Sequence, residues 1–407
     1  MNLHRRALLG GLAAAPFAMR AFAQTGTVNY WHHFTSTTEF KGLERVMALF
    51  AQKYPGIKLV QENIPNPDYM AKMTAAVMAN ARPNAAMVTA ERLNDLLGMN
   101  ALVDLTARVK SWPRYSEYPE QAWAGATAGG KIYGVPAFTF VDWMYYRKDW
   151  FDEAGLAPPK TMQDFAAAAA KFTDPARNRY GFGLRGGPGG YKFVLDLFEA
   201  WGSPIVIGGK PAIDRARAIE ALRFYTELLT KQKVVSASAP GDGYRQIMEA
   251  FKTGQTAMVW HHTGSLTEIA AAMKPGTWAT APIPAGPAAH VARMSYQFNG
   301  ISNPANVDAA WAWDSFWGEP EAAIAFLEET GYFPSSPKVA ADPRIASNPL
   351  YAAAVETTKF GRLPVAFTGV AGWSDNVVQP EFQKALTGRA TPAQAVDAMI
   401  AGLDAAM

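Results

Sequence analysis

Segments patterned as strands alternate with segments patterned as helices along most of this chain, and this alternation most constrains its fold. The first strands are predicted at residues 27–31, 57–61 and 85–89, which are short runs rich in β-branched and aromatic residues. Between the first two, residues 40–54 carry apolar residues at the spacing of an amphipathic helix. Further on, residues 143–146 read as a short strand and 309–330 as one long helix. Repeated strand-helix units predict an α/β fold with mostly parallel sheets covered by helices.

Size and composition indicate two domains held together by hydrophobic cores. The chain has 407 residues, 49% of them hydrophobic, and single cores rarely grow beyond about 250 to 300 residues. There is no cysteine, which excludes disulfides, thiolate metal sites and a lipid-modified N-terminal cysteine. Stability must therefore come from packing.

Residues 1–23 have the three parts of a secretory leader. Arg5 and Arg6 precede a short apolar stretch, and residues 21–23 (AFA) form a small-x-small cleavage site, so we expect cleavage after Ala23. The apolar stretch is shorter than the roughly 20 residues that span a bilayer. The paired arginines loosely resemble a twin-arginine export signal, and export by the Sec route is the alternative. The expected location is the periplasm.

The balance of positive and negative charges argues against nucleic acid as a partner. The leader contributes three arginines and no acid, so the remaining chain has 35 basic and 35 acidic residues. No basic stripe is present, and we expect no nucleic-acid partner.

Five motifs occur in one order along the chain and carry a family resemblance. The strongest, GKIYGVPAFTFVDWMYYRKDWFDEAGLAPPKTMQDF, spans residues 130–165. The others are FAQKYPGIKLV (50–60), FKTGQTAMVW (251–260), TGYFPSS (330–336) and LTGRATPAQAVDAM (386–399). Together they resemble the extracellular solute-binding proteins of ABC importers, of the maltose-binding and glycerol-3-phosphate-binding type. Arg147 stands where the family usually has Asn, and Asn84 where an Asp commonly follows the Pro.

The resemblance implies a type II periplasmic binding protein fold of two α/β lobes joined by hinge segments. Lobe 1 would hold residues 24–133 plus 286–331, and lobe 2 would hold 138–281 plus 335–407. Hinges are expected near 134–137, 282–287 and 332–336, where Pro- or Gly-containing connections lie between periodic segments. Binding would occur in the interlobe cleft, beyond the carboxyl ends of the strands.

The residues that follow predicted strands are candidate ligand contacts, because they combine aromatic faces with hydrogen-bonding groups. A sugar or polyol needs both, since its CH faces pack on rings and each hydroxyl needs a partner. The strand-end candidates are Trp31, His32, His33, Glu91, Trp260, His262 and Thr263, and the candidates at the crossing into the second lobe are Asp142 and Trp143. The resemblance adds Tyr69, Tyr191, Tyr332 and Trp373. Glu91 has an alternative role as a helix cap, and Trp31 and Trp260 an alternative role in the core.

The histidine pairs 32–33 and 261–262 leave two interpretations open. If both face one cleft, they could bind a transition metal. Neighbours along a strand point to opposite faces, which favours hydroxyl recognition by one histidine of each pair. A site that requires neutral imidazole would weaken as the pH falls through about 6.5.

Nothing in the sequence indicates an enzyme or a cofactor. Nucleophile-elbow, metalloprotease, Walker and Rossmann motifs are missing, and the glycine-rich residues 181–190 read as a flexible loop. The favoured function is therefore the substrate-binding component of an ABC importer, monomeric, which delivers a sugar or polyol to permease subunits. A glycerol-3-phosphate, glycerophosphodiester or metal binder of the same fold remains an alternative, with a glycoside-active enzyme more remote.

Overall fold

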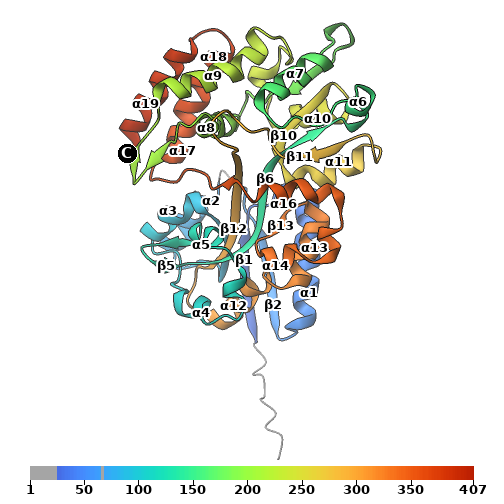
Figure 1. Cartoon of the computed structure of the whole chain (residues 1–407). Coiled ribbons are helices and arrows are strands. Elements are labelled where there is room, and N and C mark those ends of the chain that lie inside the picture. The colour runs from blue at the N-terminus through green and yellow to red at the C-terminus, as the bar shows by residue number, and fades with distance from the viewer. Residues whose placement is uncertain (1–24, 66–67) are drawn as a thin grey trace, which may run out of the picture.

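Two strands run through the middle of the molecule and connect its two lobes. They are β6 (Val135–Tyr146) and β12 (Ala292–Ile301), which pair antiparallel in the computed structural model (Figure 1). The structure describes residues 25–65 and 68–407, so the predicted leader lies outside the described residues. The predicted strand at 143–146 is the end of the longer β6, and the segment 135–137 expected as a hinge belongs to the same strand.

Lobe 1 surrounds the N-terminal half of β6 and the C-terminal half of β12. Its elements before β6 are β1 (Gly26–His32), α1 (Thr37–Lys53), β2 (Ile57–Asn63), α2 (Tyr69–Met78), β3 (Ala85–Thr89), η2 (Ala90–Arg92), α3 (Leu93–Gly98), α4 (Thr106–Lys110), η3 (Tyr115–Glu117), α5 (Glu120–Ala124), β4 (Thr127–Ala128) and β5 (Lys131–Ile132). After β12 follow α12 (Val307–Phe316), α13 (Pro320–Thr330) and β13 (Phe333–Pro334). The single helix predicted at 309–330 is thus two helices. Pro320 at the start of α13 explains the break, because proline is tolerated in the first turn of a helix and not in its interior.

Lobe 2 surrounds the other half of β6. Its elements are α6 (Lys148–Glu153), α7 (Met162–Phe172), η4 (Pro175–Arg177), β7 (Tyr180–Gly183), α8 (Tyr191–Ala200), β8 (Val206–Ile207), β9 (Lys210–Pro211), α9 (Arg215–Thr230), η5 (Ala239–Gly241), α10 (Tyr244–Lys252), β10 (Thr256–His262), η6 (Thr263–Ser265), α11 (Leu266–Ala272) and β11 (Ala279–Ala281). The C-terminal elements α17 (Val370–Trp373), η8 (Ser374–Val378), α18 (Gln379–Leu386) and α19 (Pro392–Ala406) cover α8 and α9 (Figure 1).

Most strands belong to one mixed sheet that continues from lobe to lobe, with the order β2-β1-β3-β12-β6-β10-β7 along its main path, and β4-β5 and β8-β9 form two separate two-stranded sheets. The outer pairs β1-β2, β1-β3 and β7-β10 are parallel, as predicted. The pairs β6-β10, β6-β12 and β3-β12 are antiparallel, because β6 and β12 cross between the lobes instead of returning through a helix. The α/β fold with two lobes is confirmed.

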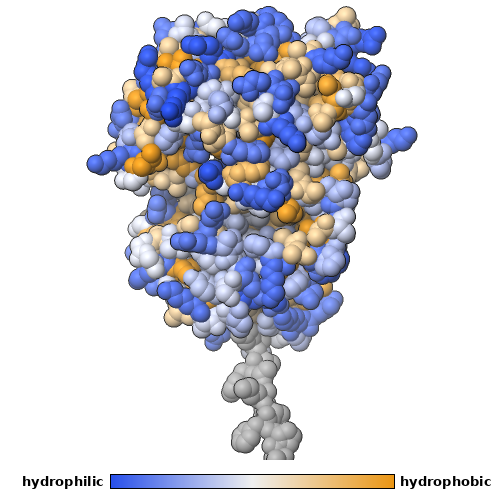
Figure 2. All heavy atoms as spheres, in the orientation of Figure 1, coloured by the Kyte–Doolittle hydropathy of each residue, from blue (hydrophilic) through white to orange (hydrophobic). Residues whose placement is uncertain are grey.

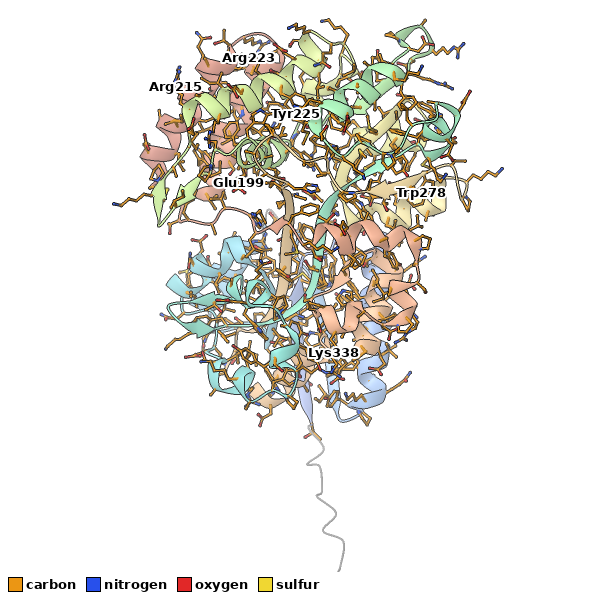
Figure 3. The ribbon with its side chains drawn as sticks, viewed as in Figure 1. Glu199, Arg215, Arg223, Tyr225, Trp278 and Lys338 are labelled. Atoms are coloured by element: carbon orange, nitrogen blue, oxygen red, sulfur yellow. The ribbon has the colours of Figure 1, made fainter. Side chains whose placement is uncertain are left out.

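The segment after β13 contacts both lobes. It contains α14 (Pro337–Ala340), α15 (Pro343–Ala346), η7 (Pro349–Tyr351), α16 (Ala352–Thr357) and β14 (Gly361–Arg362). Lys338 pairs with Glu117 of lobe 1 at 2.9 Å and lies in the lower lobe of Figure 3. Thr280 of lobe 2 donates to the carbonyl of Leu350. The assignment of residues 335–407 to one lobe, like the other lobe boundaries, stays a prediction.

Candidate functional site

A chamber of about 320 Å³ lies where the two lobes meet, and both lobes line it. Lobe 1 contributes the residues around the start of α1, and lobe 2 contributes residues from β10, α8, α10 and the loop before α8. Its lining residues are Thr35, Ser36, Thr38, Glu39, Phe140, Asp142, Arg185, Lys192, Phe193, Tyr244, His261, His262, Gly264, Glu268, Arg293 and Tyr332. We call it the front chamber.

The lobe 1 wall is the capped N-terminus of α1. Ser36 accepts from the amide of Glu39 (3.2 Å), and Oε2 of Glu39 accepts from the amide of Ser36 (2.8 Å), which is a capping box. The second carboxylate oxygen of Glu39 accepts a hydrogen bond from the hydroxyl of Tyr332 (3.1 Å). The sequence S-T-T-E thus builds a rigid hydroxyl-rich edge.

The lobe 2 wall includes His262 in a defined tautomer. Its Nδ1 accepts from the amide N–H of Gly264 (3.1 Å), so the ring proton belongs on Nε2. His261 also lines the chamber, and its Nδ1 lies 2.9 Å from Oγ of Ser265. Both histidines reach one chamber because β10 ends at His262 and the chain turns into η6.

Burial keeps both of these histidines neutral. Burial and the positive charges of Arg293, Lys192 and Arg185 lower the pKa of His262 to about 3. Burial likewise lowers the pKa of His261 well below its usual value. The expected loss of neutral imidazole near pH 6.5 is therefore wrong for this pair, because the folded site protonates only in much stronger acid.

Asp142 and Arg293 form a buried ion pair on the two crossing strands. Oδ2 of Asp142 lies 2.6 Å from Nη2 of Arg293, and the two side chains are 1% and 11% exposed. Oδ1 of Asp142 is buried and accepts no hydrogen bond from the described residues. A buried carboxylate oxygen without a donor fits a ligand hydroxyl, since leaving it unmet costs about 1 to 3 kcal/mol.

The glycine-rich segment 181–190, expected as a flexible loop, is tightly packed. A Cβ on Gly190 would lie 2.1 Å from the carbonyl oxygen of Arg185, and one on Gly186 would lie 2.4 Å from that of Ala239. Nε of Arg185 donates to the carbonyl of Pro188 (2.8 Å). The glycines therefore permit a close backbone approach that places Arg185 in the chamber wall and starts α8.

A second, smaller chamber of about 100 Å³ adjoins the first, and we call it the side chamber. It is lined by Tyr191, Lys192, Leu195, Asp196, Glu199, Ile205, Arg293, Leu363, Pro364, Val365, Val370, Ala371 and Ser374. In Figure 3, Glu199 lies at the border of the upper lobe that faces the lower one. Burial raises the pKa of Asp196 to about 8, which makes it a neutral carboxylic acid at pH 7.

Four of the thirteen residues predicted from the sequence line these chambers. Asp142, His262 and Tyr332 line the front chamber, and Tyr191 lines the side chamber. The Tyr332 ring also stacks on Phe138 with centroids 5.0 Å apart.

Trp31, Tyr69 and His32 of lobe 1 lie in its interior, and His33 is partly exposed. The rings of Trp31 and Tyr69 belong to the core beneath α2, and the Tyr69 hydroxyl donates to the carbonyl of Met87 (2.7 Å). His32 is fully buried and bonds Gln61 through Nε2 (2.7 Å). His33 lies edge-on to Tyr69, and burial and Arg92 lower its pKa to about 3. The side chain of Glu91 lies outside the described part of the structure.

The remaining predicted residues of lobe 2 are core residues. Trp260 stacks on Tyr225 with centroids 5.9 Å apart, and Trp143 packs edge-on against Tyr145. Trp373 is 2% exposed and donates from Nε1 to the carbonyl of Met399 (2.9 Å). Thr263 is fully buried next to the front chamber without lining it. Because side chains alternate along a strand, position at a strand end alone does not decide which face a residue occupies.

The residues that sequence reasoning missed include several charged ones. They include Arg185, Lys192, Arg293 and Glu39, which enter the front chamber from a loop, two helices and a crossing strand. The S-T-T-E capping signal at 36–39 was readable in the sequence. The pairing of Arg293 with Asp142, 151 positions apart, was not.

Within residues 25–65 and 68–407 there is no group of three or more potential metal-ligating side chains. In the same ranges, no helix combines the length and the hydropathy that crossing a bilayer requires. Figure 2 shows hydrophilic residues over most of the visible face, with hydrophobic ones scattered between them.

Comparisons with known proteins agree on the class of molecule. A binding protein of Brucella abortus (strain 2308) is 25% identical over 344 residues, which cover 80% of each chain. The mannitol-binding protein of Pseudomonas aeruginosa is 30% identical over 142 residues, 33% of this chain and 32% of that protein. Maltose-bound MalE3 of T. maritima has the same fold, with a TM-score of 0.83 at 21% identity over 94% of this chain and 100% of that one.

The family model described as bacterial extracellular solute-binding protein matches residues 35–324, most of the chain. That stretch includes the start of α1, both crossing strands and the whole histidine wall of the front chamber. The protein belongs to the bacterial extracellular solute-binding protein family.

Proposed function

We propose that this protein is the substrate-binding component of an ABC importer that captures a sugar or polyol between its lobes and delivers it to the membrane permease. The observation that carries the proposal is the front chamber, which takes its walls from both lobes. A ligand held there contacts α1 on one side and β10 on the other, so its contacts are complete only when the lobes are close together. Such a ligand shifts the population toward the closed form.

The lining suits a polyhydroxylated molecule. Ser36 and Thr38 offer hydroxyls, Nε2–H of His262 is a donor, and Oδ1 of Asp142 is an acceptor. Phe140 lies beside His262 with ring centroids 5.2 Å apart and supplies an apolar face. Alternating apolar faces and hydrogen-bonding groups match the CH faces and hydroxyls of a sugar.

The names of two similar proteins support this chemistry. The P. aeruginosa protein is named for mannitol, and the T. maritima structure holds maltose. We propose on the same basis an exported monomer that works in the periplasm with ABC permease subunits, without chemical change to its ligand.

Anionic polyols form the second candidate ligand class. Arg185, Lys192 and Arg293 place three cationic groups in the wall of the front chamber, which is the observation that favours it. Glycerol phosphate and glycerophosphodiesters therefore belong in the same screen as neutral sugars.

A thermal-shift screen of the purified protein tests the proposal, because a ligand that binds only the folded state raises the melting temperature by mass action. We expect stabilisation by at least one sugar or polyol, and contraction in small-angle scattering when that ligand saturates the protein. Stabilisation by divalent metals alone, or turnover of the sugar, would contradict the proposal.

A further inference from the structure

We propose that Arg293, held by Asp142, is the residue that limits the length of the ligand. This inference rests on the proposed function. The front and side chambers share just two lining residues, Lys192 and Arg293. A ligand that fills both chambers must pass between or displace these two side chains.

The strand register explains why Arg293 lies at this boundary. On β10, His262 is the register partner of Asp142 on β6. On β12, Met294 is the partner of Val141, so Arg293 is next to Asp142 across the strand pair. Arg293 is in turn the partner of Arg362 on β14. His262, Asp142 and Arg293 thus form a row across three neighbouring strands, and all three line the front chamber.

Burial makes the position of Arg293 costly to change. Its charge-assisted bond to Asp142 is 2.6 Å long, between side chains that are 11% and 1% exposed. Swinging Arg293 aside would leave a buried carboxylate without its counter-charge, which is strongly destabilising. The guanidinium is therefore a fixed partition, and Oδ2 of Asp142 positions it while Oδ1 faces the ligand.

The chambers that this partition separates differ in size and in chemistry. The front chamber, about 320 Å³, is lined by hydroxyls, histidines and charged groups. The side chamber, about 100 Å³, has an apolar wall that includes Leu195, Ile205 and Val370. With the partition in place, the cleft accepts one sugar ring or one six-carbon polyol in the front chamber. Linked rings would have to extend past Arg293.

Calorimetric titration with a length series tests the proposal, with mannitol, glucose, maltose and maltotriose as probes. The key variant is Asp142→Leu/Arg293→Met, which replaces the buried pair by apolar side chains and avoids an unpaired charge. The matched control is Asp397→Leu/Arg215→Met, because this second Arg–Asp pair lies on the surface with side chains 57% and 50% exposed.

We expect the wild-type protein to bind mannitol or glucose at least about tenfold more tightly than maltotriose. The Asp142→Leu/Arg293→Met variant also loses the acceptor Oδ1, so its affinity for every probe should fall, and the ratio of its affinities for short and long probes should approach one. The control should keep the wild-type ratio. Arg293→Lys keeps a cation at the boundary and should retain part of the preference, whereas Asp142→Asn should weaken it by releasing Arg293.

Two results would overturn the partition alone: maltotriose that binds the wild-type protein as tightly as the short probes, or an unchanged length preference in the folded double variant. A wild-type protein that binds none of the four probes overturns the partition as a limit for these sugars, whereas the proposed function fails only if no sugar or polyol stabilises the protein in the thermal-shift screen.

Discussion

The hydroxyl of Tyr332 donates a hydrogen bond to Oε1 of Glu39 (3.1 Å), although the two residues are 293 positions apart in the chain. Tyr332 directly precedes β13, and Glu39 lies in the first turn of α1. The Tyr332 ring stacks on Phe138 of β6. This contact joins the lobe 1 edge of the front chamber to a strand that crosses between the lobes.

Tyr332→Phe should destabilise the protein by about 1 kcal/mol, because it removes one hydrogen bond and leaves Glu39 accessible to water. Ligand affinity should fall as well, since the α1 edge loses its tie to the crossing strand. Urea unfolding and calorimetry measure the two effects. Tyr54→Phe is the control, because Tyr54 packs on Phe50 and lies outside both chambers. Equal stability of the two variants would argue against the contact.

Protonation of His262 should not change ligand affinity between pH 5 and 8. Its pKa of about 3 in the folded protein means that the ring is neutral throughout this range. Calorimetry at several pH values, with NMR titration of the ring, checks this. A binding transition near pH 6.5 that disappears in His262→Gln would show the opposite.

Stability should respond to acid in a defined direction. His262 and His33 titrate near 3 in the folded protein and near 6.5 when unfolded, so the unfolded chain binds more protons between these values. Their contribution to stability is therefore complete above about pH 6.5 and is lost as the pH falls toward 3. Urea midpoints from pH 7 to pH 4 measure this, and His33→Gln should flatten the decline.

Trp373→Ala should cost about 3 to 5 kcal/mol of stability, because it empties a site in the lobe 2 core. From the sequence, Trp31→Ala and Trp373→Ala are expected to weaken ligand binding by about 2 to 4 kcal/mol. Because both rings are buried in the structure, we expect these substitutions to lower the free energy of unfolding and not the ligand affinity. A stable Trp373→Ala protein with strongly reduced affinity would instead support the interpretation that the Trp373 ring contacts the ligand.

Gly190→Ala should destabilise the start of α8 by about 1 to 3 kcal/mol, since the added Cβ would lie 2.1 Å from the Arg185 carbonyl oxygen. Gly241→Ala is a matched control in the same lobe, because no atom lies within 4 Å of its added Cβ. Thermal unfolding compares the two. Similar melting temperatures would mean that the loop before α8 relaxes freely.

The fold was predictable because its signals are local. Alternating strand and helix patterns identified β1 to β3 and α1, and the ordered motifs indicated two lobes. The length of β6 was not predictable, since its first half, from Val135, reads as a Pro- and Gly-containing connection. Its strand conformation comes from pairing with β12, which lies more than 150 positions away.

The candidate site was less predictable than the fold. Reasoning from strand ends selected His262, which lines the front chamber, but it also selected Trp260, whose side chain enters the core. Adjacent positions on a strand differ in face, and the face is decided by sheet packing. Charged residues such as Arg293 gave no local signal, because their role depends on a partner on another strand.

The continuity of β6 and β12 through both lobes has a consequence for protein engineering. Phe140, Asp142 and Arg293 line the chamber from the same two strands that connect the lobes. We therefore expect a substitution that changes selectivity there to change the resting angle between the lobes as well. Biosensors built on this scaffold should therefore be recalibrated for baseline opening whenever their recognition residues are redesigned.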